Sequence, residues 1–205
     1  MQGFIIQLNR ARDEDLVVSI LTQENLETLY RFYGARHSPI NLGFKVDFEI
    51  EHSVKTTIGR LRDVIHLGYP WLRERHRTHL WQQFVKLFYP HLKQSEETGS
   101  FYFELLEASA LVWHQQNPKR IAIEAYVKLL DYEGRLHTEL VCFLCDQKIE
   151  EDISLIRAFL PTHKTCSHTL SINQKGLEEL YNNHTSLFLS DKEVDRMWLV
   201  LLEGL

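Results

Sequence analysis

The hydrophobic pattern changes its period near residue 68, and this change constrains the fold more than any other feature of the sequence. Before it, short runs such as 45–51 alternate apolar and charged residues, which is typical of strands with one buried face. After it, apolar residues recur at helical spacing, beginning with the pair at 71–72. The sequence therefore predicts an α+β multidomain chain, with a strand-rich domain over 1–68 and a helical domain over 69–205.

Five short runs in the first domain have the composition of strands, with β-branched and aromatic residues bounded by Gly, Pro and Asn. They cover residues 4–8, 16–22, 29–33, 45–51 and 61–67. Five short strands in a unit of this size fit a small closed β-barrel, for which we expect the OB-fold. The strand pattern alone leaves an SH3-like barrel open.

The second domain predicts a helical bundle. Pro118 suits the first turn of one helix, and Ser190 with Glu193 forms a capping-box pattern at the start of the last one. Pro90 is expected to kink or end the first helix, because it has no backbone N–H to donate. The expected helices cover residues 71–93, 101–113, 118–132, 176–182 and 191–203.

Charge limits the kinds of partner that the whole chain can attract. The formal net charge is -5, and residues 141–205 alone hold six Lys and Arg against ten Asp and Glu, a net of -4. A nucleic-acid surface would therefore have to be a local basic patch. No apolar run approaches the roughly 20 residues of a membrane span, and the N-terminus lacks the pattern of a signal peptide. We expect a cytoplasmic, reducing environment and no membrane partner.

The three cysteines form part of a spaced ligand pattern. Cys142 and Cys145 are separated by two residues, and His163 and Cys166 repeat that spacing further along the chain. Two such pairs match a structural zinc site, because each pair turns both side chains toward one ion and four ligands complete a tetrahedron. We expect one zinc ion per chain, within a zinc-finger-like module at about residues 140–170 that is embedded in the helical domain.

Three alternatives to this interpretation remain open. The cysteines can be unrelated buried residues, since a free cysteine packs as a small apolar side chain. Cys142 and Cys145 can form a redox pair, although no thioredoxin-like pattern surrounds them. His168 can replace His163 as the fourth ligand, but His163 preserves the two-residue spacing.

The order of several short stretches resembles the RecO family, the recombination mediator of bacterial RecFOR repair. Each stretch is weak alone, and their order along most of the chain carries the resemblance. This chain has His163-Lys-Thr-Cys166 where many relatives have a second C-x2-C pair. The stretches are Gly3-Phe4-Ile5, the acidic run Asp13 to Asp15 with Leu16-Val17, Leu21-Thr22, the basic run Arg31 to Ser38, and Leu129 to Gly134 leading to Cys142-Phe-Leu-Cys145.

This resemblance implies a fold and a function. The fold is an N-terminal OB domain followed by a helical body with a zinc-finger module. The function is binding of single- and double-stranded DNA, annealing of complementary strands, and loading of recombinase onto DNA coated with single-stranded DNA-binding protein (SSB), together with RecR. The resemblance implies no enzymatic activity and no small-molecule substrate, and it places the protein in the bacterial cytoplasm, associated with the nucleoid when it acts.

Single-strand binding that tolerates any sequence needs cations along a groove and aromatic faces for base stacking. The run from Tyr30 to His37 offers both, and an unbroken strand there would place Arg31 and Tyr33 on one face with Tyr30 and Phe32 in the core. A solvated surface is the simpler explanation for any one of these cations. The candidate DNA-binding residues are Arg31, Tyr33, Arg36, His37, Arg10, Arg12, Lys45, Arg60 and Arg62.

Three further charged stretches bear on function. The basic stretch 73–79 at the start of the first long helix is either a solvated helix face or an extension of the DNA surface. The three consecutive acids Asp13, Glu14 and Asp15 imitate a divalent-metal site of a nuclease, but a solvated turn is the simpler interpretation. The acidic residues 141–205 favour another class of function, an adaptor of the repair machinery that binds protein partners and no DNA.

Overall fold

A computed structural model describes residues 1–37, 39–52, 57–95 and 97–205. The chain divides into two compact units, Met1–Leu111 and Val112–Leu205. Within the described ranges, no helix has the length and hydropathy that a bilayer span requires. The barrel ends close to the predicted boundary at residue 68, but the helices that follow it, up to Leu111, belong to the same compact unit as the barrel.

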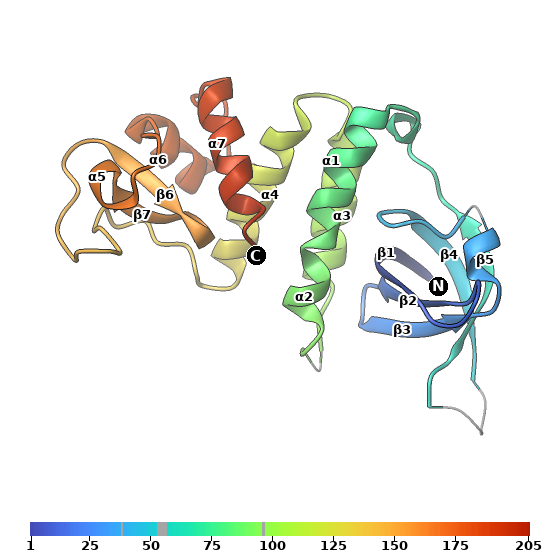
Figure 1. Ribbon diagram of the computed structural model, residues 1–205. Coiled ribbons are helices and arrows are strands. Elements are labelled where there is room, and N and C mark those ends of the chain that lie inside the picture. Colours follow the sequence, from blue (N-terminus) through green and yellow to red (C-terminus); the bar gives the residue numbers. More distant parts are fainter. Residues whose placement is uncertain (38, 53–56, 96) are drawn as a thin grey trace. The chain divides into compact units, whose positions relative to one another are not determined.

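The N-terminal unit is built on a closed five-stranded barrel with the strand order β1-β2-β3-β5-β4 (Figure 1). Antiparallel pairs join β1 to β2 and β4, β2 to β3, and β4 to β5, while β3 and β5 pair in parallel and close the barrel. This confirms the prediction of a small OB-like barrel. The strands are β1 (Gln2–Arg10), β2 (Leu16–Leu21), β3 (Leu26–Arg31), β4 (Lys45–Glu51) and β5 (Arg60–His66).

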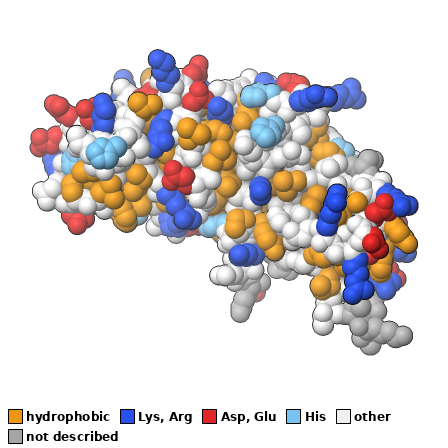
Figure 2. All heavy atoms as spheres, in the orientation of Figure 1, with side chains coloured by type: hydrophobic (Ala, Val, Ile, Leu, Met, Phe, Trp, Pro, Cys, Tyr) orange, Lys and Arg blue, Asp and Glu red, His pale blue; other side chains and the backbone are white. Residues whose placement is uncertain are grey.

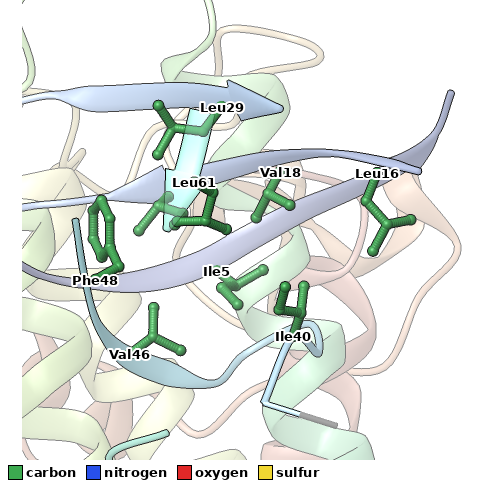
Figure 3. Packing of buried hydrophobic residues seen from close by; sticks show 9 residues of the cluster. Ile5, Leu16, Val18, Leu29, Ile40, Val46, Phe48 and Leu61 are labelled. Carbon is green, nitrogen blue, oxygen red and sulfur yellow. The ribbon is translucent and has the colours of Figure 1, made fainter. Parts of the chain in front are cut away.

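The barrel core follows from the alternation of the strands. Figure 3 shows side chains from all five strands, and Ile40 from a loop, converging on one interior. In β4, Val46 and Phe48 are buried as the pattern predicts, and Ile50 packs against the same cluster. The fully or almost fully buried members of the cluster are Ile5, Leu16, Val18, Ile20, Leu29, Ile40, Val46, Phe48 and Leu61.

The predicted third strand, 29–33, was wrong at both ends. β3 begins at Leu26 and ends at Arg31, and Tyr33 has a left-handed backbone with φ of 51°. The short 3-10 helix η1 (Gly34–Arg36) follows directly. A left-handed residue breaks the period of two, so Arg31 and Tyr33 do not share a strand face, and Phe32 leaves the core and becomes exposed.

Short helices complete the N-terminal unit. They are η2 (Pro70–Arg73), α1 (Arg75–Lys86), α2 (Phe88–Leu92) and α3 (Phe101–Val112). The predicted interruption near Pro90 falls at Leu87, between α1 and α2, where the missing N–H of Pro90 loosens the preceding turn. Trp81 of α1 lies edge-on to Phe4 of β1 and donates its indole N–H to Gly43 O at 2.7 Å, which fixes this helix on the barrel.

The second unit is helical with a small embedded hairpin. Pro118 begins α4 as expected, and Ser190 and Glu193 form the predicted capping box of α7. The hairpin of β6 and β7, which contains Pro161, was not predicted. Its elements are α4 (Pro118–Tyr132), β6 (Ile153–Ile156), η3 (Arg157–Phe159), β7 (Leu160–His163), α5 (Lys164–Ser167), α6 (Gln174–Asn183) and α7 (Asp191–Leu201).

The barrel core yields a stability prediction on β5. Leu61 is 1% exposed inside the barrel, whereas Ile65 on the same strand is 61% exposed. We expect Leu61→Ala to lower the free energy of unfolding by about 2–5 kcal/mol, because it removes transfer energy and leaves a cavity. Ile65→Ala, the matched control, should change it by less than about 1 kcal/mol. Urea-induced unfolding of the full chain measures both, and equal effects would contradict the described core.

Candidate functional site

The first cysteine pair lies in a tight chain reversal. Ile149 N donates to Leu140 O at 2.8 Å, and Cys142 N donates to Gln147 O at the same distance, so the chain turns back within the residues between them. Asp146 N donates to Cys142 O at 2.8 Å, and Asp146 adopts a left-handed backbone. The two-residue spacer turns both thiols to the same side of this reversal, as metal-binding pairs require.

The second pair lies where a strand changes into a helix. β7 ends at His163, which also precedes the first residue of α5, and Cys166 lies within that helical turn. Phe143 N donates to Pro161 O at 2.9 Å, which joins β7 to the first reversal. The hairpin that the sequence did not reveal therefore brings the second pair to the first.

The four side chains converge on one point. The candidate ligand atoms of Cys142, Cys145, His163 and Cys166 all lie within 4.8 Å of one another. His163 Nδ1 lies 3.4 Å from Cys145 Sγ and 3.8 Å from Cys166 Sγ. Tetrahedral zinc with ordinary bond lengths separates a thiolate sulfur from an imidazole nitrogen by about 3.6 Å. The group therefore fits a zinc ion, and its four protein ligands would leave no position open for a substrate.

The surroundings prepare these groups for a metal. His163 Nε2 lies 3.2 Å from Lys148 O, a contact that leaves Nδ1 for the ion. Burial opposes ionisation of the Cys142 thiol, but hydrogen bonds from the backbone N–H groups of His163, Leu144 and Cys145 outweigh it and lower its pKa to about 6. Burial and the two neighbouring thiols raise the pKa of Cys166 to about 11, a cost that a divalent cation relieves.

The alternatives for the cysteines account for less of this geometry. His168 is not a member of the converging group; it ends α5 with a left-handed backbone and lines a different pocket. A redox pair of Cys142 and Cys145 gives no reason for His163 and Cys166 to meet them. The same objection applies to unrelated buried cysteines, since Cys145 is exposed.

A network around Asp15 organises the predicted DNA surface. One carboxylate oxygen accepts a hydrogen bond from Tyr30 Oη at 2.6 Å, and the other accepts one from Tyr33 N at 2.7 Å. The hydrogen bonds from Tyr30 and from the Tyr33 backbone lower the pKa of Asp15 below its usual value. Glu14 forms an ion pair with Arg36. The acidic turn thus holds the loop that follows β3.

Arg31 has a structural contact as well as a place on this surface. Its Nη1 donates to Leu61 O at 2.8 Å, which links β3 to β5, and its Nη2 lies 3.4 Å from His37 Nε2. Its buried Nε has no hydrogen-bond partner within the described residues. Arg31 and His37 therefore lie together, as the sequence predicts.

The remaining arginines of this region lie beside aromatic rings. The Arg36 guanidinium carbon lies 5.6 Å from the centre of the Tyr33 ring, and that of Arg60 lies 5.2 Å from the Phe32 ring. Arg62 pairs with Glu51 at 3.4 Å and remains 57% exposed. We call Tyr30, Arg31, Phe32, Tyr33, Arg60 and Arg62 the aromatic–arginine group, because they line one surface pocket of about 200 Å³.

The other predicted DNA contacts are not part of that group. Arg10 and Arg12 are exposed at the end of β1 and in the turn before β2. Lys45 is 12% exposed, pairs with Glu107 of α3 and lies over the Phe103 ring, so its charge is compensated within the unit. Ser38, the last residue of the basic run, lies outside the described residues.

The basic stretch 73–79 begins α1, and its cations have different surroundings. Arg77 pairs with Glu74 at 2.9 Å, while Arg73 and Arg75 are exposed. Figure 2 shows Lys and Arg side chains scattered among acidic and apolar ones on the visible face of each unit. On this face, the cations that could meet a polyanion are therefore dispersed among other side chains.

The converging cysteines and histidine generate a prediction about metal content. We expect about one zinc ion per chain, and Cys145→Ser should lower the content well below one, because a serine hydroxyl does not ionise as a thiol does. It should also lower the melting temperature, since metal binding to a structural site adds to folding free energy. His168→Ala is the matched control and should keep the metal.

Elemental analysis of protein purified without chelator, together with thermal unfolding, measures both effects. Loss of the ion from the His168 variant but not from the Cys145 variant would overturn the ligand assignment.

Comparison with known proteins bears on the N-terminal unit. Residues 1–72 match a family model described as RecO N terminal, and this range covers the whole barrel and extends into η2. No curated protein matches the chain. The matched range ends within four residues of the predicted domain boundary at 68. Its five strands are the closed barrel that carries the aromatic–arginine group, so this barrel is similar to the N-terminal domain of RecO proteins.

Proposed function

We propose that this protein is a recombination mediator of DNA repair. In this role it binds single- and double-stranded DNA and anneals complementary strands. It also works with RecR to load recombinase onto DNA coated with SSB. The match of the barrel to the RecO N-terminal family carries the proposal, because RecFOR repair is the process in which that family acts.

The aromatic–arginine group, together with Arg36 beside Tyr33, supplies the chemistry that DNA binding needs. Arginines neutralise phosphates, and exposed aromatic rings offer faces to unpaired bases. The arginines that pair with acids do so at exposed positions, where an ion pair contributes at most about 1 kcal/mol. A phosphate can therefore replace Glu14 or Glu51 as the partner of Arg36 or Arg62 at little cost.

The proposal includes no enzymatic step. Two of the three consecutive acids that imitate a nuclease site are engaged within the protein, Glu14 with Arg36 and Asp15 with Tyr30 and Tyr33. The four converging side chains would hold zinc with no position open for a substrate, so a bound ion would stabilise its module. We expect DNA to remain uncut after incubation with the protein and magnesium. Cleavage would contradict the absence of an enzymatic step.

The central prediction concerns the unmodified protein. Fluorescence anisotropy of a labelled single-stranded oligonucleotide should rise on titration at low salt, and the affinity should fall as salt increases, because phosphate contacts release counterions. Addition of the complementary strand should then give faster annealing than in the absence of protein. Failure to bind at low salt would contradict the proposal.

A second prediction concerns the cations themselves. Arg31 is unsuitable because it also joins β3 to β5, so we choose the exposed Arg36 and Arg62. Replacing both with Gln should weaken single-strand binding on the order of tenfold and reduce the slope of log K against log salt by about 1.4, since each lost contact contributes about 0.7. Anisotropy over a range of salt concentrations measures this.

The matched control carries the same change of charge elsewhere. Lys128→Gln with Lys192→Gln removes two exposed cations from the other unit. This variant should bind DNA nearly as the unmodified protein does. An equal loss in both double variants would mean that net charge, and not the positions of Arg36 and Arg62, governs binding.

One observation favours a second candidate, an adaptor that binds protein partners and no DNA. Residues 141–205 carry ten acidic against six basic residues, and Phe143 and Leu144 are exposed between the first two metal ligands. A stable complex with a repair protein, in the absence of DNA binding at low salt, would support this candidate over the mediator.

A further inference from the structure

The pocket between the end of β3 and β5 has an unusual lining. Three of its seven lining residues are aromatic, three are arginines and none is acidic. Its volume of about 200 Å³ is smaller than the roughly 300–1,000 Å³ of pockets for drug-sized ligands, so it suits a single ring system. The lining favours a flat, electron-rich group that is attached to an anion.

Phe32 is the residue that gives this pocket its apolar face. The strand pattern places it in the core, but β3 ends at Arg31 and the Phe32 side chain is 47% exposed. The Tyr30 ring meets it edge-on, with the ring centres 5.0 Å apart, and the Arg60 guanidinium lies 5.2 Å from its centre. These contacts hold the Phe32 ring in position while part of it remains accessible.

Phe32 is not one of the buried residues that form the barrel core. About half of the Phe32 side chain is accessible, and three arginines line the same pocket. The place of Phe32 is accounted for by a ligand that stacks on aromatic rings or on guanidinium planes, as nucleobases do. A base inside a duplex has both faces covered by its neighbours, so only an unpaired base can use this surface.

We propose that this pocket binds one unpaired nucleobase of single-stranded DNA. The base stacks on Phe32 and the Arg60 guanidinium, while Arg62, released from Glu51, meets the adjoining phosphate. Phe32 thereby gives the protein a preference for single strands over duplex. This proposal rests on the proposed DNA binding and adds to it a specificity-determining residue and the chemical group that it recognises.

The test compares three probes of equal length: a labelled oligothymidylate, the same backbone with abasic sites, and a duplex. Phe32→Leu should weaken oligothymidylate binding by about tenfold, which corresponds to the lower part of the range for loss of one stacked base. It should change abasic and duplex binding by less than about twofold. Phe188→Leu is the matched control, because Phe188 is also exposed with a cation, Lys175, 5.5 Å from its ring centre.

A second variant gives a spectroscopic readout. Phe32→Trp adds an exposed indole, whereas the native Trp71, Trp81, Trp113 and Trp198 are at most 4% exposed. Oligothymidylate should quench the added fluorescence, and the abasic strand should not. This signal reports stacking and would not change if Phe32 had a purely structural role.

The outcomes separate the two proposals. If the unmodified protein binds none of the three probes, both the proposed function and the proposed nucleobase pocket are wrong. If it binds them but Phe32→Leu loses nothing, or loses equally on all three, the proposed function stands and the nucleobase pocket is overturned.

Discussion

The closure of the barrel between β3 and β5 is the constraint on which the candidate surface depends. The two strands share one residue pair in register, Tyr30 with Arg60, supported by Tyr30 N donating to Gly59 O at 2.9 Å. Arg31 adds a charged hydrogen bond to Leu61 O. Because this parallel pairing is so short, the barrel is closed there by side-chain contacts as well as by backbone hydrogen bonds. Arg31, which makes such a contact, also lines the pocket.

The same closure explains how an acidic chain can present a cationic pocket. Asp15 accepts hydrogen bonds from Tyr30 and Tyr33, and it does not line the pocket. Glu14 and Glu51 hold arginines through exposed ion pairs that are readily exchanged. The net charge of -5 therefore says little about this surface, since screening limits each charge to a range of about 8–10 Å at physiological salt.

The sequence predicted those parts of the fold that depend on interactions between residues close together in the chain. The alternation of β4, Pro118 at the start of α4 and the capping box of α7 depend on neighbours within a few residues. The end of β3 could not be read this way, because the left-handed turn at Tyr33 is held by Asp15, 18 residues earlier. The β6–β7 hairpin was missed for a related reason: Pro161 and four-residue strands weaken the pattern, and hydrogen bonds to other segments compensate.

The candidate metal group was predictable to the residue, while the DNA surface was predictable only in outline. Ligands of a metal must be particular residue types at fixed spacing, so the sequence itself carries their geometry. Contacts to phosphate tolerate many positions, and whether an arginine is available depends on its tertiary neighbours. Lys45 and Arg62 look alike in the sequence, yet one pairs with Glu107 at 12% exposure and the other stays 57% exposed. Phe32 extends this argument, because the sequence assigns it to the core and only the end of its strand makes it available to a base.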